Sequence, residues 1–250
     1  MIRLTHDGSL ARITLDRAEA RNAVPLAAWD QLAEAVTAAE GANARAILVS
    51  GAGGAFCAGA DLTEFDAIRE DPARRSTFRL AMRRGIDALA ASPMPVVALI
   101  QGACFGAGVA LAMAADIRIA DARARFAITP AKIGIGYPQE DIARLVALTG
   151  PGAAARLLFT GAEIDGGEAL RIGLVNGLGG ADEMERLVAQ ILACDPASHA
   201  MLKRGIGLAT PGITSDAEQD RLFDDLLGSP ALAAALSRRR NKAALPPAEA

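Results

Sequence analysis

The chain has 250 residues, of which 52% are apolar and 4% aromatic, and its formal net charge at pH 7 is −3. This length fits one large domain, or one domain with a small appendage. The slightly acidic balance excludes the extended basic surface that nucleic-acid-binding proteins need. One dense basic run, residues 237–242, lies near the C-terminus, and we interpret it as a solvated or interfacial helix end.

Cysteines and histidines are few and widely spaced. Cys57, Cys104 and Cys194 are odd in number, which argues against a disulfide framework or a zinc site and favours a reducing compartment. His6 and His199 lie far from any central motif, so we expect no histidine triad and no metal site. The N-terminus has no apolar signal core, and no apolar run reaches about 18 residues. We therefore expect a cytoplasmic protein with no nucleic-acid or membrane partner.

Apolar periodicity divides most of the chain into alternating strands and helices. The expected strands cover residues 10–16, 45–51, 95–101 and 116–121, and the expected helices cover 25–40, 76–92 and 108–115. Strands that alternate with helices in this way predict an α/β layered fold with largely parallel pairing.

The strand pattern stops at about residue 180. Four helical patterns follow, at residues 181–193, 197–209, 215–228 and 231–244. We predict a core domain over residues 1–180 and a helical region over 181–250, which either folds back on the core or packs against another subunit. The last residues, 246–250, are expected to form a loose tail.

Two glycine-rich junctions follow buried strands, at residues 50–62 (SGAGGAFCAGADL) and 101–111 (QGACFGAGVAL). Glycine lets the backbone turn sharply, and a helix start offers unpaired N–H groups. Two such junctions side by side would aim two N–H donors at one point, as an oxyanion hole requires. Each could instead be a plain turn. Neither contains the Walker-A ending or G-x-G-x-x-G, so a nicotinamide or ATP enzyme is a weaker alternative.

Four stretches in order carry a family resemblance: residues 16–24, 55–62, 101–120 and 159–178. They resemble the enoyl-CoA hydratase/isomerase family, the crotonase superfamily. The resemblance implies a ClpP/crotonase-like spiral of repeated ββα units with a helical C-terminal trimerisation region, assembled as a homotrimer or hexamer. It also implies an acyl-CoA substrate, of which coenzyme A is a part, and no separate cofactor.

The resemblance assigns a role to particular positions. The oxyanion-hole N–H groups carry over to Ala60 and Ala107, between which the thioester carbonyl would lie. Ala107 replaces the commoner glycine, which keeps the N–H group but adds a methyl group. The CoA side of the site would be lined by Arg21, Ala23, Ala58, Asp61 and Leu62.

Hydratases of the resembled family use two glutamates, and neither is present here. Their positions are occupied by Ala110 and by Pro130, in the stretch FAITPAKIGIGYPQED (residues 126–141). Neither residue transfers protons, and general acid–base catalysis supplies roughly 10²–10⁴-fold in rate. Ordinary hydration is therefore not expected, nor is isomerisation that depends on the second acid.

The same stretch resembles the corresponding part of methylmalonyl-CoA decarboxylase, a branch of the family. The resemblance places Thr129 and Tyr137 at that branch's pocket hydroxyls, where they would orient a carboxylate and Tyr137 could help return a proton. Decarboxylation of a malonyl-type thioester leaves an enolate for the two N–H groups to hold, and it requires no base. That branch carries a histidine and a glutamate where this chain has Ala60 and Ala110, so the match is local.

Two further interpretations stay open. Glu140 and Asp141 follow Tyr137 and could supply the acid of an isomerase or hydratase, although both also suit a helix start. Asp61 and Glu64 are further candidate acids, but Asp61 is better interpreted as a residue that stabilises a loop and Glu64 as an exposed helix residue. Finally, a protein without the two standard acids could bind acyl-CoA without converting it.

Overall fold

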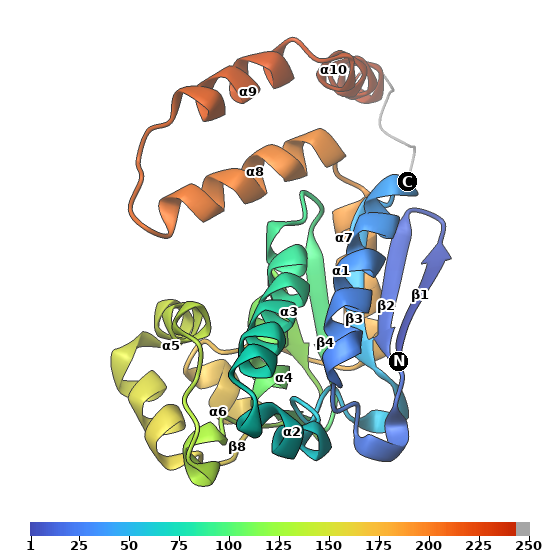
Figure 1. Ribbon diagram of the computed structural model, residues 1–250. Coiled ribbons are helices and arrows are strands. Elements are labelled where there is room, and N and C mark those ends of the chain that lie inside the picture. The colour runs from blue at the N-terminus through green and yellow to red at the C-terminus, as the bar shows by residue number, and fades with distance from the viewer. Residues whose placement is uncertain (244–250) are drawn as a thin grey trace. The chain divides into compact units, whose positions relative to one another are not determined.

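The computed structural model describes residues 1–243, which belong to two compact units divided between residues 192 and 193 (Figure 1). The predicted tail at 246–250 lies outside the described residues. The strands are β1 (Ile2–Asp7), β2 (Leu10–Leu15), β3 (Ala46–Gly51), β4 (Val96–Ile100), β5 (Ala103–Phe105), β6 (Ile117–Ala120), β7 (Arg125–Ala127), β8 (Ile164–Asp165) and β9 (Gly177–Leu178). The helices are α1 (Leu26–Gly41), α2 (Phe65–Glu70), α3 (Pro72–Ala91), α4 (Ala107–Met113), α5 (Gln139–Thr160), α6 (Gly166–Arg171), α7 (Ala181–Leu192), α8 (Pro196–Ala209), α9 (Ala217–Leu227) and α10 (Pro230–Ala243).

The strands form two sheets. Six strands make the main sheet in the order β1-β2-β3-β4-β6-β9, and β5-β7-β8 make a small second sheet. All neighbours in the main sheet are parallel except β1 and β2, which form an antiparallel pair at one edge. The predicted α/β fold with largely parallel strands is thus confirmed, whereas β1 and the second sheet were not predicted.

The central strands are buried on both faces, as parallel strands usually are. On β3, Ile47 and Val49 belong to the cluster that contains Trp29 of α1 and Ile86 of α3. The alternate residue Leu48 packs on the other face with residues of α7. Figure 1 shows α1 and α3 together on one side of the main sheet.

Helix α7 belongs to the sheet and not to the C-terminal helices. Its residues Met184 and Val188 are buried in the same cluster as Leu48 and Val97. The first compact unit of the structure ends at residue 192, and the predicted domain boundary lies at residue 180. The unit ends where it does because the apolar face of α7 is buried against the sheet, and the composition of residues 181–192 does not reveal that contact.

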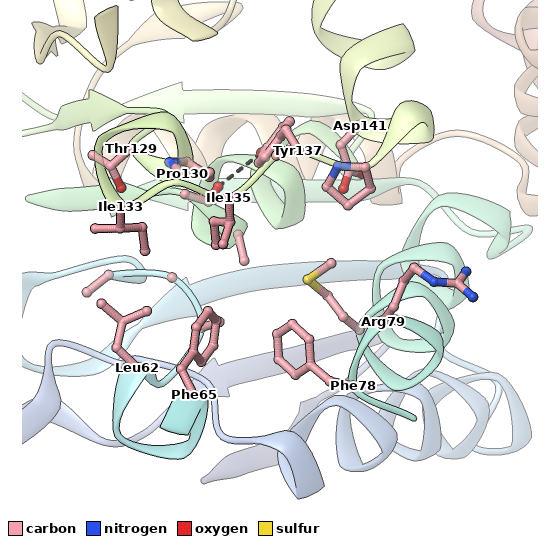
Figure 2. A pocket seen from close by; sticks show the side chains of 18 residues that line it. Leu62, Phe65, Phe78, Arg79, Thr129, Pro130, Ile133, Ile135, Tyr137 and Asp141 are labelled. Carbon is pink, nitrogen blue, oxygen red and sulfur yellow. Dashed lines mark hydrogen bonds between the residues drawn. The ribbon is translucent and has the colours of Figure 1, made fainter. Parts of the chain in front are cut away.

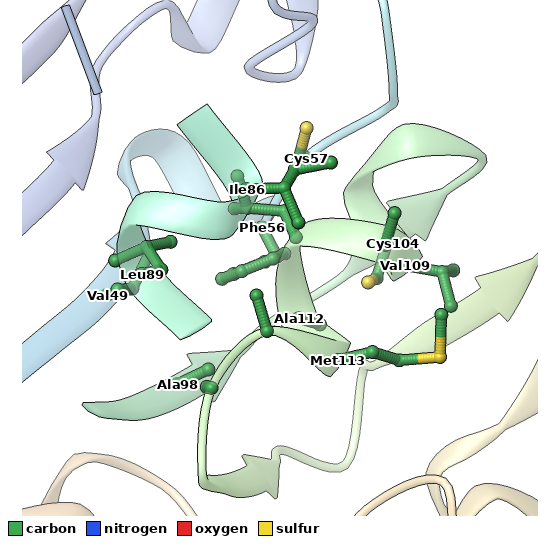
Figure 3. Packing of buried hydrophobic residues seen from close by; sticks show 14 of the residues in the cluster. Val49, Phe56, Cys57, Ile86, Leu89, Ala98, Cys104, Val109, Ala112 and Met113 are labelled. Carbon is green, nitrogen blue, oxygen red and sulfur yellow. The ribbon is translucent and has the colours of Figure 1, made fainter. Parts of the chain in front are cut away.

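The two glycine junctions are joined directly by their backbones. Cys57 of the first pairs with Cys104 of the second: Cys57 N donates to Ala103 O at 2.9 Å and Phe105 N to Cys57 O at 2.8 Å. Both cysteines are buried free thiols within the core packing seen in Figure 3, and burial raises the pKa of Cys57 to about 12. The pairing fixes the residues that follow, Ala60 and Ala107, on neighbouring loops.

Among the described residues, α5 is the one helix whose length and apolar composition would allow it to cross a membrane. Its course is interrupted at Gly150, where φ is 73° and ψ is 162°, and Pro151 follows. Neither half reaches the roughly 20 residues that a spanning helix needs. Its first turn also holds the fully buried Asp141.

The second unit contains α8, α9 and α10. Arg204 of α8 forms an ion pair with Asp216 at 2.7 Å, and Gln219 of α9 donates to Met201 O at 2.9 Å. Several large apolar side chains of this unit are exposed: Leu202, Ile206, Ile213, Phe223, Leu227 and Leu236. The predicted helices are confirmed over the described residues.

Candidate active site

A cavity of about 240 Å³ lies within the first unit, next to both glycine junctions. Figure 2 shows Leu62, Phe65 and Phe78 on one wall and Ile133 and Ile135 on the opposite wall. The complete lining is Ala58, Gly59, Ala60, Leu62, Phe65, Phe78, Arg79, Met82, Gly106, Ala107, Thr129, Pro130, Ile133, Ile135, Gly136, Tyr137, Pro138 and Asp141. A mostly apolar cavity with a few convergent polar groups is typical of a small-molecule site.

The two predicted oxyanion-hole residues, Ala60 and Ala107, both line this cavity. Neighbouring amides of the first junction are engaged, since Val24 N donates to Gly59 O and Asp61 N donates to Val24 O. Within residues 1–243, the N–H groups of Ala60 and Ala107 donate to no protein acceptor. They are therefore free to bind a ligand oxygen.

The junctions approach so closely that a side chain between them would not fit. Gly59 has φ 109°, and a Cβ atom there would lie 2.9 Å from Phe105 O and 3.5 Å from Ala107 N. Glycine adopts such a conformation without strain. The short distances show that the first junction lies directly against Ala107.

Thr129 and Tyr137 approach the second junction at Gly106. Tyr137 Oη donates a hydrogen bond to Gly106 O at 3.0 Å (Figure 2), and Thr129 Oγ1 lies 4.0 Å from where a Cβ of Gly106 would be. Burial raises the pKa of Tyr137 well above its ordinary value, so the hydroxyl keeps its proton. That proton is donated to a backbone carbonyl of the second junction.

Asp141 lines the cavity and is fully buried. Its Oδ1 atom accepts a hydrogen bond from Arg83 Nη1 at 2.9 Å and lies 3.5 Å from Arg144 Nη1. Asp87 completes a ring of charges by bridging Arg83 and Arg144. Burial raises the pKa of Asp141, and the hydrogen bond and charge of Arg83 oppose that shift.

Glu140, Ala110 and Pro130 lie in different surroundings in the structure. Glu140 is exposed and does not line the cavity, although it is adjacent to Asp141. Ala110, in the first turn of α4, is fully buried and also lies outside the lining. Pro130 forms part of the cavity wall. Asp141 is thus the one carboxyl group in the lining of this cavity.

The residues expected on the CoA side divide into two groups. Ala58 and Leu62 line the cavity, and Leu62 is exposed. Arg21 and Ala23 lie behind the first junction: Arg21 O accepts from Ala58 N at 2.9 Å, and Ala23 O accepts from an arginine side chain. Arg21 and Ala23 therefore stabilise the first junction through their backbone carbonyls.

Asp61, also expected on the CoA side, does not line the cavity. Its carboxylate accepts hydrogen bonds from Arg17 Nη1 at 2.5 Å and from Thr63 N at 3.0 Å. The hydrogen bond from Arg17 lowers the pKa of Asp61. Glu64 accepts a hydrogen bond from Leu26 N at 2.7 Å, at the start of α1. Both acids stabilise the backbone around the first junction.

Sequence reasoning missed Asn22, a fully buried residue with φ 59°. Its side-chain amide donates to Ala52 O and Ala55 O, and its Oδ1 accepts from Arg17 N. It therefore fixes the first junction from behind. Asn22 lies between Arg21 and Ala23, and its identity alone gave a weak signal, because asparagine is common at left-handed backbone positions of many turns.

The wall made by α2 and α3 was also missed. Phe65 and Phe78 pack edge to face with ring centroids 5.5 Å apart, and Met82 lies beside them in the lining. Periodicity indicated only an amphipathic helix over residues 76–92, which includes Phe78 and Met82 but not Phe65, and nothing local connected these residues to those near 135. Among the described residues, His, Cys, Asp and Glu form no group of three that could hold a metal ion.

Comparison with known proteins agrees with this geometry. The profile of the enoyl-CoA hydratase/isomerase family matches residues 5–210. The Mycobacterium tuberculosis protein named "probable enoyl-CoA hydratase echA6" is 34% identical over 231 residues, covering 92% of this chain and 91% of that protein. The short-chain-enoyl-CoA hydratase of Clostridium acetobutylicum is 34% identical over 175 residues, covering 69% of this chain and 66% of its own length.

Solved structures support the same assignment. An enoyl-CoA hydratase/isomerase family protein from Hyphomonas neptunium superposes with a TM-score of 0.91 at 36% identity, covering 96% of this chain and 95% of that one. The enoyl-CoA hydratase from Thermoplasma volcanium gives a TM-score of 0.88 at 31% identity, covering 95% and 96%. The sequence match extends over most of the chain, and the fold agrees with that of the solved structures. This chain belongs to the enoyl-CoA hydratase/isomerase family, the crotonase superfamily.

Proposed function

We propose that this protein binds an acyl-CoA thioester and stabilises the enolate of that thioester with the N–H groups of Ala60 and Ala107. The observation that carries the proposal is the pair of unengaged N–H groups beside one apolar cavity. Preorganised donors of this kind stabilise developing negative charge in a site from which water is excluded. Relatives named as enoyl-CoA hydratases support an acyl-CoA ligand.

The narrower proposal is decarboxylation of a malonyl-type CoA thioester. The bond between the α-carbon and the carboxylate breaks, CO₂ leaves, and the electron pair forms the enolate, which then takes a proton. Ala110 and Pro130 support this reaction because it needs no base at either position. The apolar walls support it as well, since the carboxylate loses its hydration on entering the cavity.

A second candidate is isomerisation or hydration of an enoyl-CoA with Asp141 as the acid–base group. The position of Asp141 in the lining favours it, together with the raised pKa of that carboxyl. A carboxyl group that holds its proton nearer to neutral pH is better suited to transfer it. Glu140, the other acid considered, has no place in this candidate because it is exposed.

The test is mass spectrometry, with chromatographic separation of isomers, after incubation of excess protein with malonyl-, methylmalonyl-, crotonyl- and 3-enoyl-CoA. Loss of CO₂ from a malonyl-type thioester supports decarboxylation. Gain of water or a shifted double bond supports the second candidate, provided that it disappears in an Asp141→Asn variant that is still folded and still binds the acyl-CoA. Binding without any conversion would contradict both and favour an acyl-CoA-binding protein.

The proposal includes a homotrimer or hexamer assembled through the C-terminal helices of a cytoplasmic protein. The exposed Ile206 and Phe223 support such an assembly, because a second subunit packed on them would remove their apolar surface from water. Light scattering coupled to gel filtration would give the subunit number, and a monomer at micromolar concentration would contradict this part.

A further inference from the structure

We propose that Tyr137 is a positioning residue: its hydroxyl holds the Gly106–Ala107 peptide plane so that the N–H group of Ala107 faces the ligand oxygen. This inference rests on the proposed function, since it assigns Tyr137 a part in the same oxyanion hole. It differs from the role implied by the family resemblance, in which the tyrosine hydroxyl acts on the substrate carboxylate.

The argument begins with the planarity of the peptide unit. The carbonyl of Gly106 and the N–H of Ala107 belong to one rigid plane and point in opposite directions in the trans form. The Tyr137 hydroxyl donates to Gly106 O at 3.0 Å. Whatever fixes the direction of this carbonyl therefore also fixes the direction of the Ala107 N–H.

This peptide plane needs such support because of the residue that precedes it. Gly106 has φ 50° and ψ −117°, a conformation open mainly to glycine, and glycine permits rotation of the following peptide plane at little steric cost. A rotated plane would turn the carbonyl of Gly106 toward the cavity, where it would repel an oxyanion. Val109 N at 3.0 Å and the more distant Ala110 N at 3.4 Å also donate to this carbonyl.

The hydroxyl itself is held by elements on either side. Tyr137 directly precedes Pro138, the residue before α5, and Asp141 in the first turn of α5 is anchored to Arg83 of α3. Burial keeps the hydroxyl protonated and hence a hydrogen-bond donor. Its contact with Gly106 thus transmits the position of α5 and α3 to the N–H group of Ala107.

The test compares Tyr137→Phe with the wild-type chain, using acetoacetyl-CoA as the probe. The enolate of this thioester absorbs in the near ultraviolet, so its share of the bound ligand can be measured at a fixed pH. Free CoA, which lacks the thioester carbonyl, is the second probe. The matched control is Thr149→Val, which also removes a hydroxyl that donates to a backbone carbonyl, Leu145 O at 2.9 Å, but outside the cavity lining.

We expect Tyr137→Phe to lower the bound enolate-to-keto ratio about 3- to 10-fold, the effect of one hydrogen bond, and to leave the affinity for free CoA unchanged. Thr149→Val should alter neither quantity. An unchanged ratio in Tyr137→Phe, or equal weakening of both probes, would overturn the positioning role. Absence of enolate on the wild-type protein itself would instead overturn the proposed function.

Discussion

Asp141 of α5 accepts a hydrogen bond from Arg83 of α3 at 2.9 Å, and this ion pair joins the two sides of the candidate active site. The carboxylate is fully buried and the Arg83 side chain is only 15% exposed. Such a pair is costly to break because Arg83 would lose its buried partner and keep the half-exposed Asp87. The position of α5 against α3, and hence the shape of the cavity, depends on it.

Replacement of Asp141 by Asn should lower the free energy of unfolding by about 3–5 kcal/mol, because Arg83 and Arg144 lose their buried carboxylate. Urea denaturation at pH 7 measures the change. Glu140→Gln is the matched control, since Glu140 is the exposed neighbouring acid, and its effect should stay within about 0.5 kcal/mol. Equal effects of the two substitutions would contradict the structural importance of the ion pair.

The ion pair between Asp61 and Arg17 predicts a pH dependence of stability. The pKa of Asp61 is lowered on folding by the hydrogen bond from Arg17. A carboxyl with a depressed folded-state pKa adds stability above its unfolded value of about 3.9, and this stability is lost as the pH falls through the folded value. Asp61→Asn should therefore cost about 1.5–3 kcal/mol at pH 7, and less in acid. Denaturation of both proteins at pH 7 and pH 3 checks this, and a constant difference would contradict it.

Substitution of Gly59 by Ala tests the close approach of the two junctions. The new Cβ would lie 2.9 Å from Phe105 O at a φ of 109°, so we expect a loss of about 1–3 kcal/mol in unfolding free energy. Turnover should fall further than this loss explains, because the carbonyl and the adjacent Ala107 must shift. Gly207→Ala in α8 is the control, since a Cβ there meets nothing within 4 Å. Full turnover by Gly59→Ala would show that the junctions need not touch.

Ala110→Glu, which introduces the acid that the family resemblance implies for hydratases at this position, should fail to create a hydratase. Ala110 is fully buried outside the cavity lining, so the new carboxyl would have neither room nor a partner. We expect a loss of about 2–4 kcal/mol in stability and no gain of water by crotonyl-CoA. Thermal unfolding and a crotonyl-CoA assay measure the two effects. Hydration by a stable variant would instead mean that the chain lacks only this acid.

Much of the fold could be predicted from local pattern. The strands β2, β3, β4 and β6 and the helices α1, α3 and α4 follow from apolar periodicity. Strand β1 was missed because most of its residues are not buried, so it lacks a clear apolar face. The end of the first compact unit at residue 192 could not be placed from the sequence, because it depends on the burial of Met184 and Val188 against distant strands.

The candidate site was predictable where it is made of backbone. Glycine content located both junctions, and Ala60 and Ala107 followed from the family resemblance. The choice between Glu140 and Asp141 could not be made, because adjacent residues face different sides of a helix and packing alone selects the buried one. The hydrogen bond from the Tyr137 hydroxyl to the Gly106 carbonyl joins residues 31 positions apart, so no local sequence pattern predicts it.

The central claim is that the Ala107 N–H stabilises the enolate, and Ala107→Pro tests it most directly. Proline removes the N–H group and is tolerated as the first residue of a helix, the position that Ala107 occupies in α4. Ala217→Pro makes the same change at the start of α9, outside the cavity. For the acyl-CoA that the wild-type protein converts, Ala107→Pro should lose about 10²–10³-fold in kcat, and Ala217→Pro should lose little. A folded Ala107→Pro variant with wild-type kcat would contradict the account.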